Sequence, residues 1–251
     1  MRLVPALALA LVLPCFASPA SAADDGFGPQ SVKPEAWSFT LGKSRAAALH
    51  DAAFVLKNDA KTIGLGETPE AVAQVLRAAG APTDRIPLSV NALLVRSGKR
   101  VMLVDTGLGE TMNGAMLASL KAAGVQPAEV TDVLLTHTHF DHYGGLIDAK
   151  GGLVFPQATI RLSAKEWAWM QAQEADKAKA LAPKVQTFEP GRPIAPGVTP
   201  IETYGHTPGH VSFEIVSGGK RLVAVGDIAH SSIVSLAKPG WSMQFDTSDA
   251  E

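Results

Sequence analysis

Three of the seven histidines of this chain fall within residues 137–142, which read His-Thr-His-Phe-Asp-His. The apolar run 133–135 precedes them and Gly144-Gly145 follows, so they lie where a strand buried on both faces ends in a loop. Alternate residues of an extended segment share a face, so His137 and His139 can point at one ion. Asp141 and His142 can then turn towards a neighbouring position. Imidazole nitrogen and carboxylate oxygen suit zinc, with iron or manganese as alternatives. The stretch predicts a metal site rather than solvated surface histidines.

Three further polar stretches follow predicted strands. Asp105 comes directly after the strand 100–104, where its carboxylate can either brace a neighbouring site loop or serve as an ordinary turn aspartate. The loop 205–210 reads Gly-His-Thr-Pro-Gly-His, and Asp227 follows the strand 221–225. Several strand ends therefore carry residues that can bind a metal ion.

Residues 1–22 have the pattern of a signal peptide: a positive start at Arg2, an apolar stretch 3–13 and the small residues Ala20-Ser21-Ala22. The apolar stretch is too short to span a bilayer, and no later segment approaches the roughly twenty apolar residues that a transmembrane helix needs. We expect an exported protein, periplasmic or secreted, with lipidation at Cys15 as the alternative. Cys15 is the only cysteine, so the mature chain offers no disulfide and no thiolate ligand.

The remaining chain of about 230 residues, in a sequence that is 46% hydrophobic and 18% charged, is sufficient for one large or two small domains. Loss of Arg2 lowers the formal charge from −2 to about −3, and no basic patch indicates nucleic acid. Residues 23–36 are rich in Gly, Pro and Asp and are expected to form a flexible lead-in. We assign 37–251 to a single domain.

The apolar patterns predict an α/β protein. The alanine-rich segment 45–49 favours a helix by propensity, with His50-Asp51 ending it in a loop. Trp167 and Trp169 lie in a charged helix that starts near Ser163; we expect them to pack against the core, with a lid over the site as the alternative. Strands are predicted at 37–41, 53–56, 90–95, 100–104, 159–162, 198–203, 213–216 and 221–225, and helices at 69–79 and 116–123.

Taken in chain order, Asp105-Thr106-Gly107, the histidine run 137–142, the loop 205–210 and Gly226-Asp227 resemble the motifs of the metallo-β-lactamase-fold superfamily of metal-dependent hydrolases. The resemblance covers nearly all of the mature chain and is specific for fold more than for substrate. It implies an αββα sandwich, with two mixed sheets face to face, helices outside and metals at one edge. It also implies that the segment 45–49 is a strand.

The resemblance further implies a set of ligands: His137, His139 and His206 for a first metal, Asp141 and His142 for a second, and Asp227 shared by both. Two cations about 3.5 to 4 Å apart lower the pKa of a water between them towards 7 and polarise the scissile oxygen. Asp141 would also orient that water.

Three histidines lie outside this set. His210 is expected to support the loop rather than bind metal, and His50 to be structural or at the rim. In related acyl-homoserine lactonases a tyrosine in the place of His230 contacts the substrate oxygen, so His230 either positions or protonates the substrate or is a solvated loop histidine.

Relatives with a bridging aspartate carry a further histidine after it, and none follows His230 in this sequence. We therefore expect a chain truncated at its C-terminus, without the last part of the second half of the sandwich. Near one zinc per chain, weak activity and poor solubility would follow.

Asp227 disfavours a true β-lactamase, and the export signal with the segment 105–109 resembles the branch near methyl-parathion hydrolase and the quorum-quenching lactonases. We expect hydrolysis of an ester-like small molecule, a lactone first. The alternatives are a phosphotriester hydrolase, a β-lactamase, an iron-dependent sulfur dioxygenase or an inactive truncated metal-binding remnant. The oligomeric state stays open.

Overall fold

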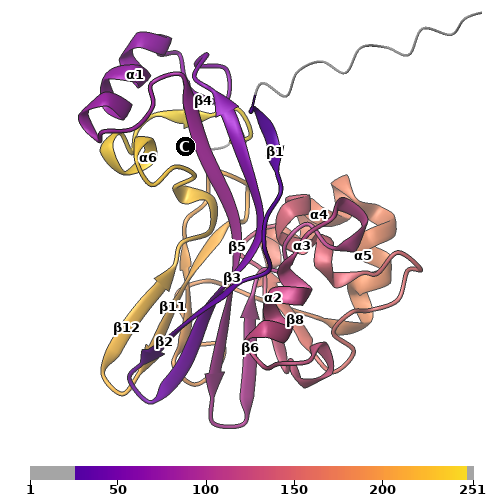
Figure 1. The fold of residues 1–251 in the computed structure, drawn as a ribbon. Helices are drawn as coiled ribbons and strands as arrows, with labels where there is room; N and C mark the ends of the chain where they lie inside the picture. The colour runs from indigo at the N-terminus through magenta and orange to yellow at the C-terminus, as the bar shows by residue number, and fades with distance from the viewer. Residues whose placement is uncertain (1–25, 248–251) are drawn as a thin grey trace, which may run out of the picture.

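The computed structural model describes residues 26–247, so the expected signal peptide lies outside the described residues. Two β-sheets form the centre of the molecule (Figure 1). The larger sheet has the strand order β1-β3-β5-β6-β7-β8-β9, with β2 also paired to β3. Its strands are β1 (Gly28–Gln30), β2 (Ala36–Leu41), β3 (Ser44–Lys57), β5 (Arg85–Ser97), β6 (Arg100–Val104), β7 (Asp132–Leu134), β8 (Thr159–Ser163) and β9 (Val185–Phe188).

This larger sheet is mixed. The pairs from β1 to β6 are antiparallel, whereas β6 to β9 run parallel. The second sheet is antiparallel and contains β10 (Val198–Glu202), β11 (Val211–Ser217) and β12 (Lys220–Ala224). A short third ladder joins β4 (Ile63–Leu65) to β13 (Ser242–Met243).

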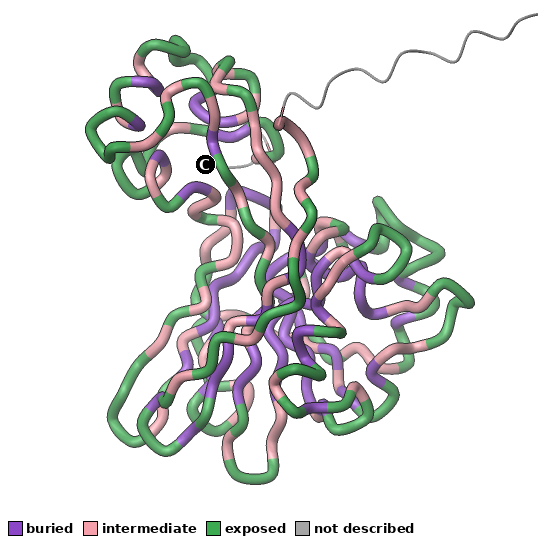
Figure 2. The backbone as a smooth tube through the Cα atoms, viewed as in Figure 1, coloured by how far each residue is buried: buried purple, intermediate pink, exposed green. Residues whose placement is uncertain are grey.

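Helices cover one face of the larger sheet, and the smaller sheet covers the other (Figure 1). Strand β7 shows both contacts, because Val133 packs into the core beneath the helices while Leu134 packs against Phe213 and other residues of the smaller sheet. Figure 2 shows buried residues concentrated where these layers meet. The order helix, sheet, sheet confirms the predicted α/β sandwich and the strand buried on both faces. The helices are α2 (Met116–Ala122), α4 (Ala164–Gln173) and α5 (Ala175–Leu181).

The alanine-rich segment is a strand, as the family resemblance implies, and the helix favoured by propensity is wrong. Ala46 packs in the core between the sheets and Ala47 in the core beneath the helices, so alternating burial overrides the helix propensity of alanine. The expected loop at His50 is also wrong. His50 lies inside β3, where the register shifts between His50 and Ala52, and the strand continues to Lys57.

Part of the expected flexible lead-in is also ordered. Residues 28–30 form β1, whose Gly28 pairs with Val55 of β3. A short Gly-Pro-Gln segment has no strand pattern of its own, so only its partner strand explains this pairing.

The far ends of β3 and β5 extend beyond the sandwich into a smaller lobe with α1 (Pro69–Ala78), α6 (Val234–Ala237), β4 and β13 (Figure 1). Val72, Leu76 and Ile86 form the core of this lobe. Helix α1 begins as predicted, since the Thr68 side chain accepts a hydrogen bond from the Ala71 backbone amide. Among the described helices, none has the length and apolar character that a bilayer crossing requires.

Candidate metal centre

The polar residues singled out in the sequence meet at one edge of the sandwich. Strands β6 and β7 are parallel, so the residues after their carboxyl ends, Asp105 and the segment 136–139, arrive side by side. Asp141 and His142 lie in α3 (Phe140–Tyr143), which begins directly after His139. The loop between β10 and β11 supplies His206, and a 3-10 turn after β12 supplies Asp227.

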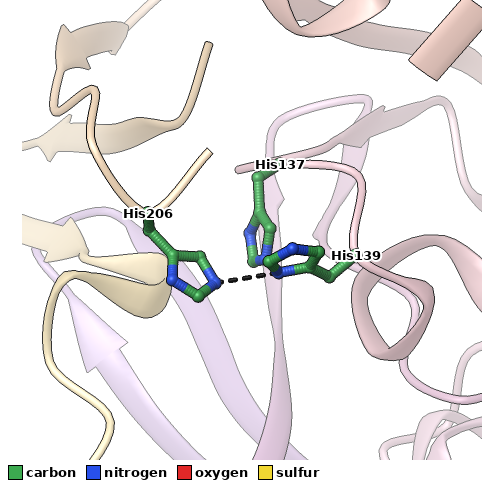
Figure 3. A group of neighbouring side chains, drawn as sticks. All are labelled: His137, His139 and His206. Atoms are coloured by element: carbon green, nitrogen blue, oxygen red, sulfur yellow. Dashed lines mark hydrogen bonds between the residues drawn. The ribbon is translucent and has the colours of Figure 1, made fainter. Parts of the chain in front are cut away.

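His137, His139 and His206 form a first group of ring nitrogens (Figure 3). Nε2 of His137 lies 3.0 Å from Nδ1 of His139, which in turn lies 2.9 Å from Nε2 of His206. Tetrahedral zinc with bonds of about 2.0–2.1 Å places its nitrogen ligands about 3.3–3.4 Å apart. The spacing in this structure is a few tenths of an ångström shorter, so the three ring nitrogens lie close enough together to bind a single ion.

The outward-facing nitrogens of two of these rings have defined partners. Nδ1 of His137 lies 3.1 Å from the Thr136 hydroxyl, which itself donates to Asp105. Nδ1 of His206 lies 2.9 Å from Oδ1 of Asp246. Since Nδ1 carries the proton in both rings, the Nε2 lone pairs point into the group, as metal binding requires.

Burial keeps the first group neutral. It lowers the pKa of the His137 imidazole well below its ordinary value, and it lowers the pKa of His139 to about 4. Burial also lowers the pKa of His206, although the Asp246 carboxylate partly opposes this effect. A neutral imidazole at pH 7 is the form that binds a metal ion.

His142, Asp141 and Asp227 form a second group. Nδ1 of His142 donates to Asp105 at 2.9 Å, while its Nε2 faces Asp141 Oδ2 at 3.5 Å and Asp227 Oδ1 at 3.3 Å. Burial alone lowers the pKa of His142, but the carboxylates of Asp227 and Asp105 outweigh it and raise this pKa well above its ordinary value. The result is one imidazole enclosed by carboxylates, next to the first group.

Asp227 joins the two groups. Its Oδ1 faces His142, whereas its Oδ2 lies 3.5 Å from Nε2 of His206. Burial would raise the pKa of this carboxyl, but the interactions with His142 and His230 lower it well below its usual range. Asp227 thus presents one oxygen to each group, as a carboxylate shared between two ions would.

His230 lies beside Asp227, with Nε2 3.3 Å from Oδ2. This nitrogen is buried, and it has no hydrogen-bond partner among the described residues. An unsatisfied buried nitrogen aimed at a cluster of metal-type donors indicates that a ligand belongs there. The converging lone pairs of the first group show that the residues present fit a bound metal ion.

The remaining two histidines lie outside these groups. His210 is fully buried behind Asp227: its Nε2 accepts the Asp227 backbone N–H at 3.0 Å, and its Nδ1 lies 3.1 Å from the Thr203 carbonyl. Both nitrogens of His210 are therefore occupied. The His50 side chain is absent from the groups of possible metal ligands found among the described residues.

Of the two alternatives for Asp105, the structure favours bracing. Its carboxylate accepts hydrogen bonds from the Thr136 backbone amide and hydroxyl, both at 2.8 Å, as well as from His142. The Asp105 backbone is left-handed, with φ of 60°, a conformation that aspartate tolerates better than most residues. Trp167 packs against the core beneath the helices, as predicted, whereas Trp169 contacts the His139 ring in a T-shaped arrangement beside the site, with centroids 5.7 Å apart.

Two acidic residues that contact this centre or its loops were not among those predicted from the sequence. Asp246 lies 40 positions after His206, outside any motif, and no signal in the sequence could have found it. Glu166 stands three residues after Ser163, a spacing that resembles a helix capping box. That pattern draws attention to Glu166, but its carboxylate faces the loops of the metal centre instead of the start of its own helix.

A cleft of about 1050 Å³ opens above the two groups. Asp141, His142, His206, Asp227 and His230 line its base. Most of its remaining wall is apolar and comes from strands β2, β3, β5 and β12, from α3 and α6, and from residues after β13. These side chains include Trp37, Phe39, Phe54, Leu88, Phe140, Leu236 and Phe245.

Comparisons with known proteins agree with this geometry. The model of the metallo-beta-lactamase superfamily matches residues 85–251. An N-acyl homoserine lactonase from a Bacillus species is 27% identical over 158 residues, which are 53% of this chain and 61% of that protein. The chain thus spans about six tenths of the length of the curated relatives that it matches first.

Two solved structures share the fold over most of their length. AidC, a dizinc quorum-quenching lactonase solved with a product, N-hexanoyl-L-homoserine, superposes with a TM-score of 0.78 at 26% identity, covering 85% of this chain and 81% of AidC. AbOPH, a hydrolase of the beta lactamase superfamily, gives a TM-score of 0.74 at 29% identity, covering 86% and 81%.

The family model spans about two thirds of the chain, including the histidine run, the loop with His206 and Asp227. These motifs lie together in the structure, at one edge of a sandwich that superposes on members of the same superfamily. The chain belongs to the metallo-beta-lactamase superfamily.

Proposed function

We propose that this protein is a metal-dependent hydrolase of ester-like small molecules, with a lactone as its preferred substrate. The observation that carries the proposal is the position of the two donor groups at the base of an apolar cleft. A lactone with an aliphatic tail offers a polar carbonyl for the base and apolar surface for the walls. The likeness to a Bacillus lactonase and to AidC supports the same substrate class.

His137, His139 and His206 would hold the first metal, Asp141 and His142 the second, and Asp227 both. When bound, such ions polarise the substrate carbonyl and make hydroxide available from water near neutral pH. Nitrogen and carboxylate donors suit zinc best, and iron or manganese also accept them. Metal analysis of the purified protein identifies the ion.

The protein side chains then have separate roles. Asp141 keeps about a third of its side chain exposed, so it can accept a hydrogen bond from the attacking water and orient it. His230 can donate a proton from Nε2 to the alkoxide that leaves when the ring opens, because this atom has no other hydrogen-bond partner among the described residues. The apolar walls exclude bulk water from the substrate tail.

A panel of substrates tests the proposal. The purified chain, loaded with zinc, is offered an N-acyl homoserine lactone, a phosphotriester and a β-lactam at matched concentrations. We expect kcat/KM for the lactone to exceed the other two by at least about tenfold, which corresponds to about 1.4 kcal/mol of transition-state stabilisation. Faster hydrolysis of the phosphotriester or the β-lactam would contradict the lactone assignment.

The iron-loaded protein, incubated with a persulfide in an oxygen electrode, provides the second arm. Oxygen uptake above the background of a His137→Ala variant would identify a sulfur dioxygenase and overturn the hydrolase proposal. A fully metal-loaded chain that turns over none of these compounds would support the inactive remnant.

A further inference from the structure

Glu166 is a completely buried acid in the first turn of α4 and is not among the residues that line the cleft. Its Oε1 accepts two hydrogen bonds from Thr138, from the backbone amide at 2.7 Å and from the hydroxyl at 2.8 Å. Its Oε2 accepts one from the Thr207 hydroxyl at 2.7 Å and one from the Gly209 amide at 3.0 Å. Each oxygen of one carboxylate therefore serves a different loop.

These two loops carry the three histidines of the first group. Thr138 stands between His137 and His139, and Thr207 directly follows His206. The segments 137–139 and 205–209 are joined by the hydrogen bonds of Glu166 and by the contacts between the histidine rings. Among the described residues, no other hydrogen bond links these two segments. Just outside these segments, the Val211 backbone amide donates to the Thr136 carbonyl at 2.9 Å. Glu166 therefore helps to set the spacing of His206 from the other two rings.

The helix itself is fixed against the second loop. The Ser163 hydroxyl accepts the Glu166 backbone amide at 3.0 Å and donates to the Gly209 carbonyl at 2.6 Å. A Cβ on Gly209 would lie 2.1 Å from the Glu166 backbone nitrogen, so only glycine permits this close approach. The backbone of α4 at Glu166 is therefore fixed against the second loop.

All four groups that contact the Glu166 carboxylate are donors, so all four need an acceptor. A carboxylate supplies acceptors on both oxygens, whereas the amide of glutamine presents an acceptor on one side and a donor on the other. Glutamine can satisfy one loop, but it places N–H against the N–H of the other. Burial raises the pKa of Glu166, while the four hydrogen bonds oppose that effect.

We propose that Glu166 is a positioning residue of the metal centre, which holds the loop of His206 in register with the loop of His137 and His139. This inference rests on the proposed function in one respect, that these three histidines bind the first metal ion. Glu166 does not touch the ion or the substrate. It acts through the two threonines that adjoin the ligands.

The test measures metal binding rather than turnover. Metal-free wild type, Glu166→Gln and the control Glu174→Gln, an exposed glutamate at the end of α4, are titrated with Co²⁺ and followed by visible absorption. We expect affinity for the first Co²⁺ to fall roughly 10- to 100-fold in Glu166→Gln and to stay unchanged in the control. The d–d bands of the Co²⁺-bound Glu166→Gln should weaken, because a displaced His206 leaves a less tetrahedral site.

Thr207→Val and Thr207→Ser form a second, milder pair. Valine removes one hydrogen bond to Glu166, whereas serine keeps the hydroxyl. We expect weaker Co²⁺ binding with valine and recovery with serine, even if Glu166→Gln fails to fold. Wild-type affinity and an unchanged spectrum in a folded Glu166→Gln or in Thr207→Val would overturn the positioning role and leave only a contribution to stability.

The same titration separates this inference from the proposed function. If wild type and His137→Ala bind Co²⁺ equally weakly, the ligand assignment fails and both proposals fall. If wild type binds tightly and His137→Ala does not, the metal centre stands, and the Glu166 and Thr207 variants decide the positioning role.

Discussion

Three of the clustered histidines are oriented by the group that contacts their Nδ1 atom. Thr136 lies at Nδ1 of His137, Asp105 at Nδ1 of His142 and Asp246 at Nδ1 of His206. In each case Nε2 is left to face the centre. Hydroxyl and carboxylate partners of this kind fix the tautomer and the ring orientation of metal-binding histidines.

The first prediction concerns the ligands themselves. His206→Ala should lose the metal that wild type retains after dialysis, because it removes one of the three nitrogen donors of the first group. Elemental analysis measures the loss, with His50→Ala as the control, since the His50 side chain is not one of the clustered donors. Equal metal content in His206→Ala and wild type would show that the ligand assignment is wrong.

The second prediction concerns pH. Burial lowers the pKa of His210 to about 3, against about 6.5 in an unfolded chain. As the pH falls below 6.5, the unfolded chain takes up a proton that the folded chain does not, so stability falls by about 1.4 kcal/mol per pH unit for this residue. His210→Gln removes the proton uptake, and its amide oxygen can still accept the Asp227 N–H.

Urea unfolding of the metal-free proteins between pH 6 and pH 5 measures this effect. The dependence of unfolding free energy on pH should be less steep in His210→Gln by about one proton, while the two proteins should show parallel dependence above pH 7.5. Parallel curves over the whole range would mean that His210 is protonated in the folded chain.

Sequence alone could locate most of this centre but could not supply its supports. The histidine run is contiguous, and the loop 205–210 and Asp227 belong to motifs, so spacing and strand context identify them. Glu166 and Asp246 are brought to the loops by tertiary contacts, across 28 positions in the case of Thr138 and Glu166. No local pattern records such a contact.

Among the elements, the C-terminal segment 241–247 stands out because it lies against the His206 loop. The Thr247 backbone amide donates to the His206 carbonyl at 3.1 Å, and its hydroxyl donates to the Gly205 carbonyl at 3.0 Å. Asp246 is held in turn by the Met243 amide at 2.7 Å. This segment therefore orients His206 through contacts that are separate from those of Glu166.

The third prediction tests this element. Asp246→Ala should weaken binding of the first metal roughly 10-fold, because Nδ1 of His206 loses its carboxylate partner. Zinc titration in competition with a chromophoric chelator gives the affinity, and Asp176→Ala, which truncates an exposed acid on α5, serves as the control. An affinity unchanged from wild type would show that this segment does not support metal binding by His206.

Strand β3 shows why element prediction from propensity fails locally. Its alanines favour a helix in isolation, but in the folded protein they alternate between two cores. Strand β1 is paired only because β3 presents a free edge to it. Elsewhere the apolar pattern is sufficient: the predicted strands 90–95 and 100–104 lie within β5 and β6, which pair as an antiparallel hairpin.

At the scale of the whole molecule, the long strands β3 and β5 connect the sandwich to the smaller lobe (Figure 1). Phe54 of β3 and Leu88 of β5 line the cleft, together with residues from β12 and from the C-terminal part of the chain. Parts of the chain that are distant in sequence thus build the apolar walls, while the strand ends supply the polar base. The fold therefore places the clustered metal-type donors in the same cleft as these apolar side chains.

The central claim is that lactone hydrolysis depends on metal held by the clustered histidines and aspartates. Its most direct measurement is the rate of proton release from an N-acyl homoserine lactone before and after a chelator strips the protein, and again after zinc is restored. We expect the rate to fall at least about 100-fold on stripping and to recover with added zinc, whereas His206→Ala should not recover at the same zinc concentration. A stripped protein, shown to be free of metal, that opens the lactone at the original rate would contradict the account.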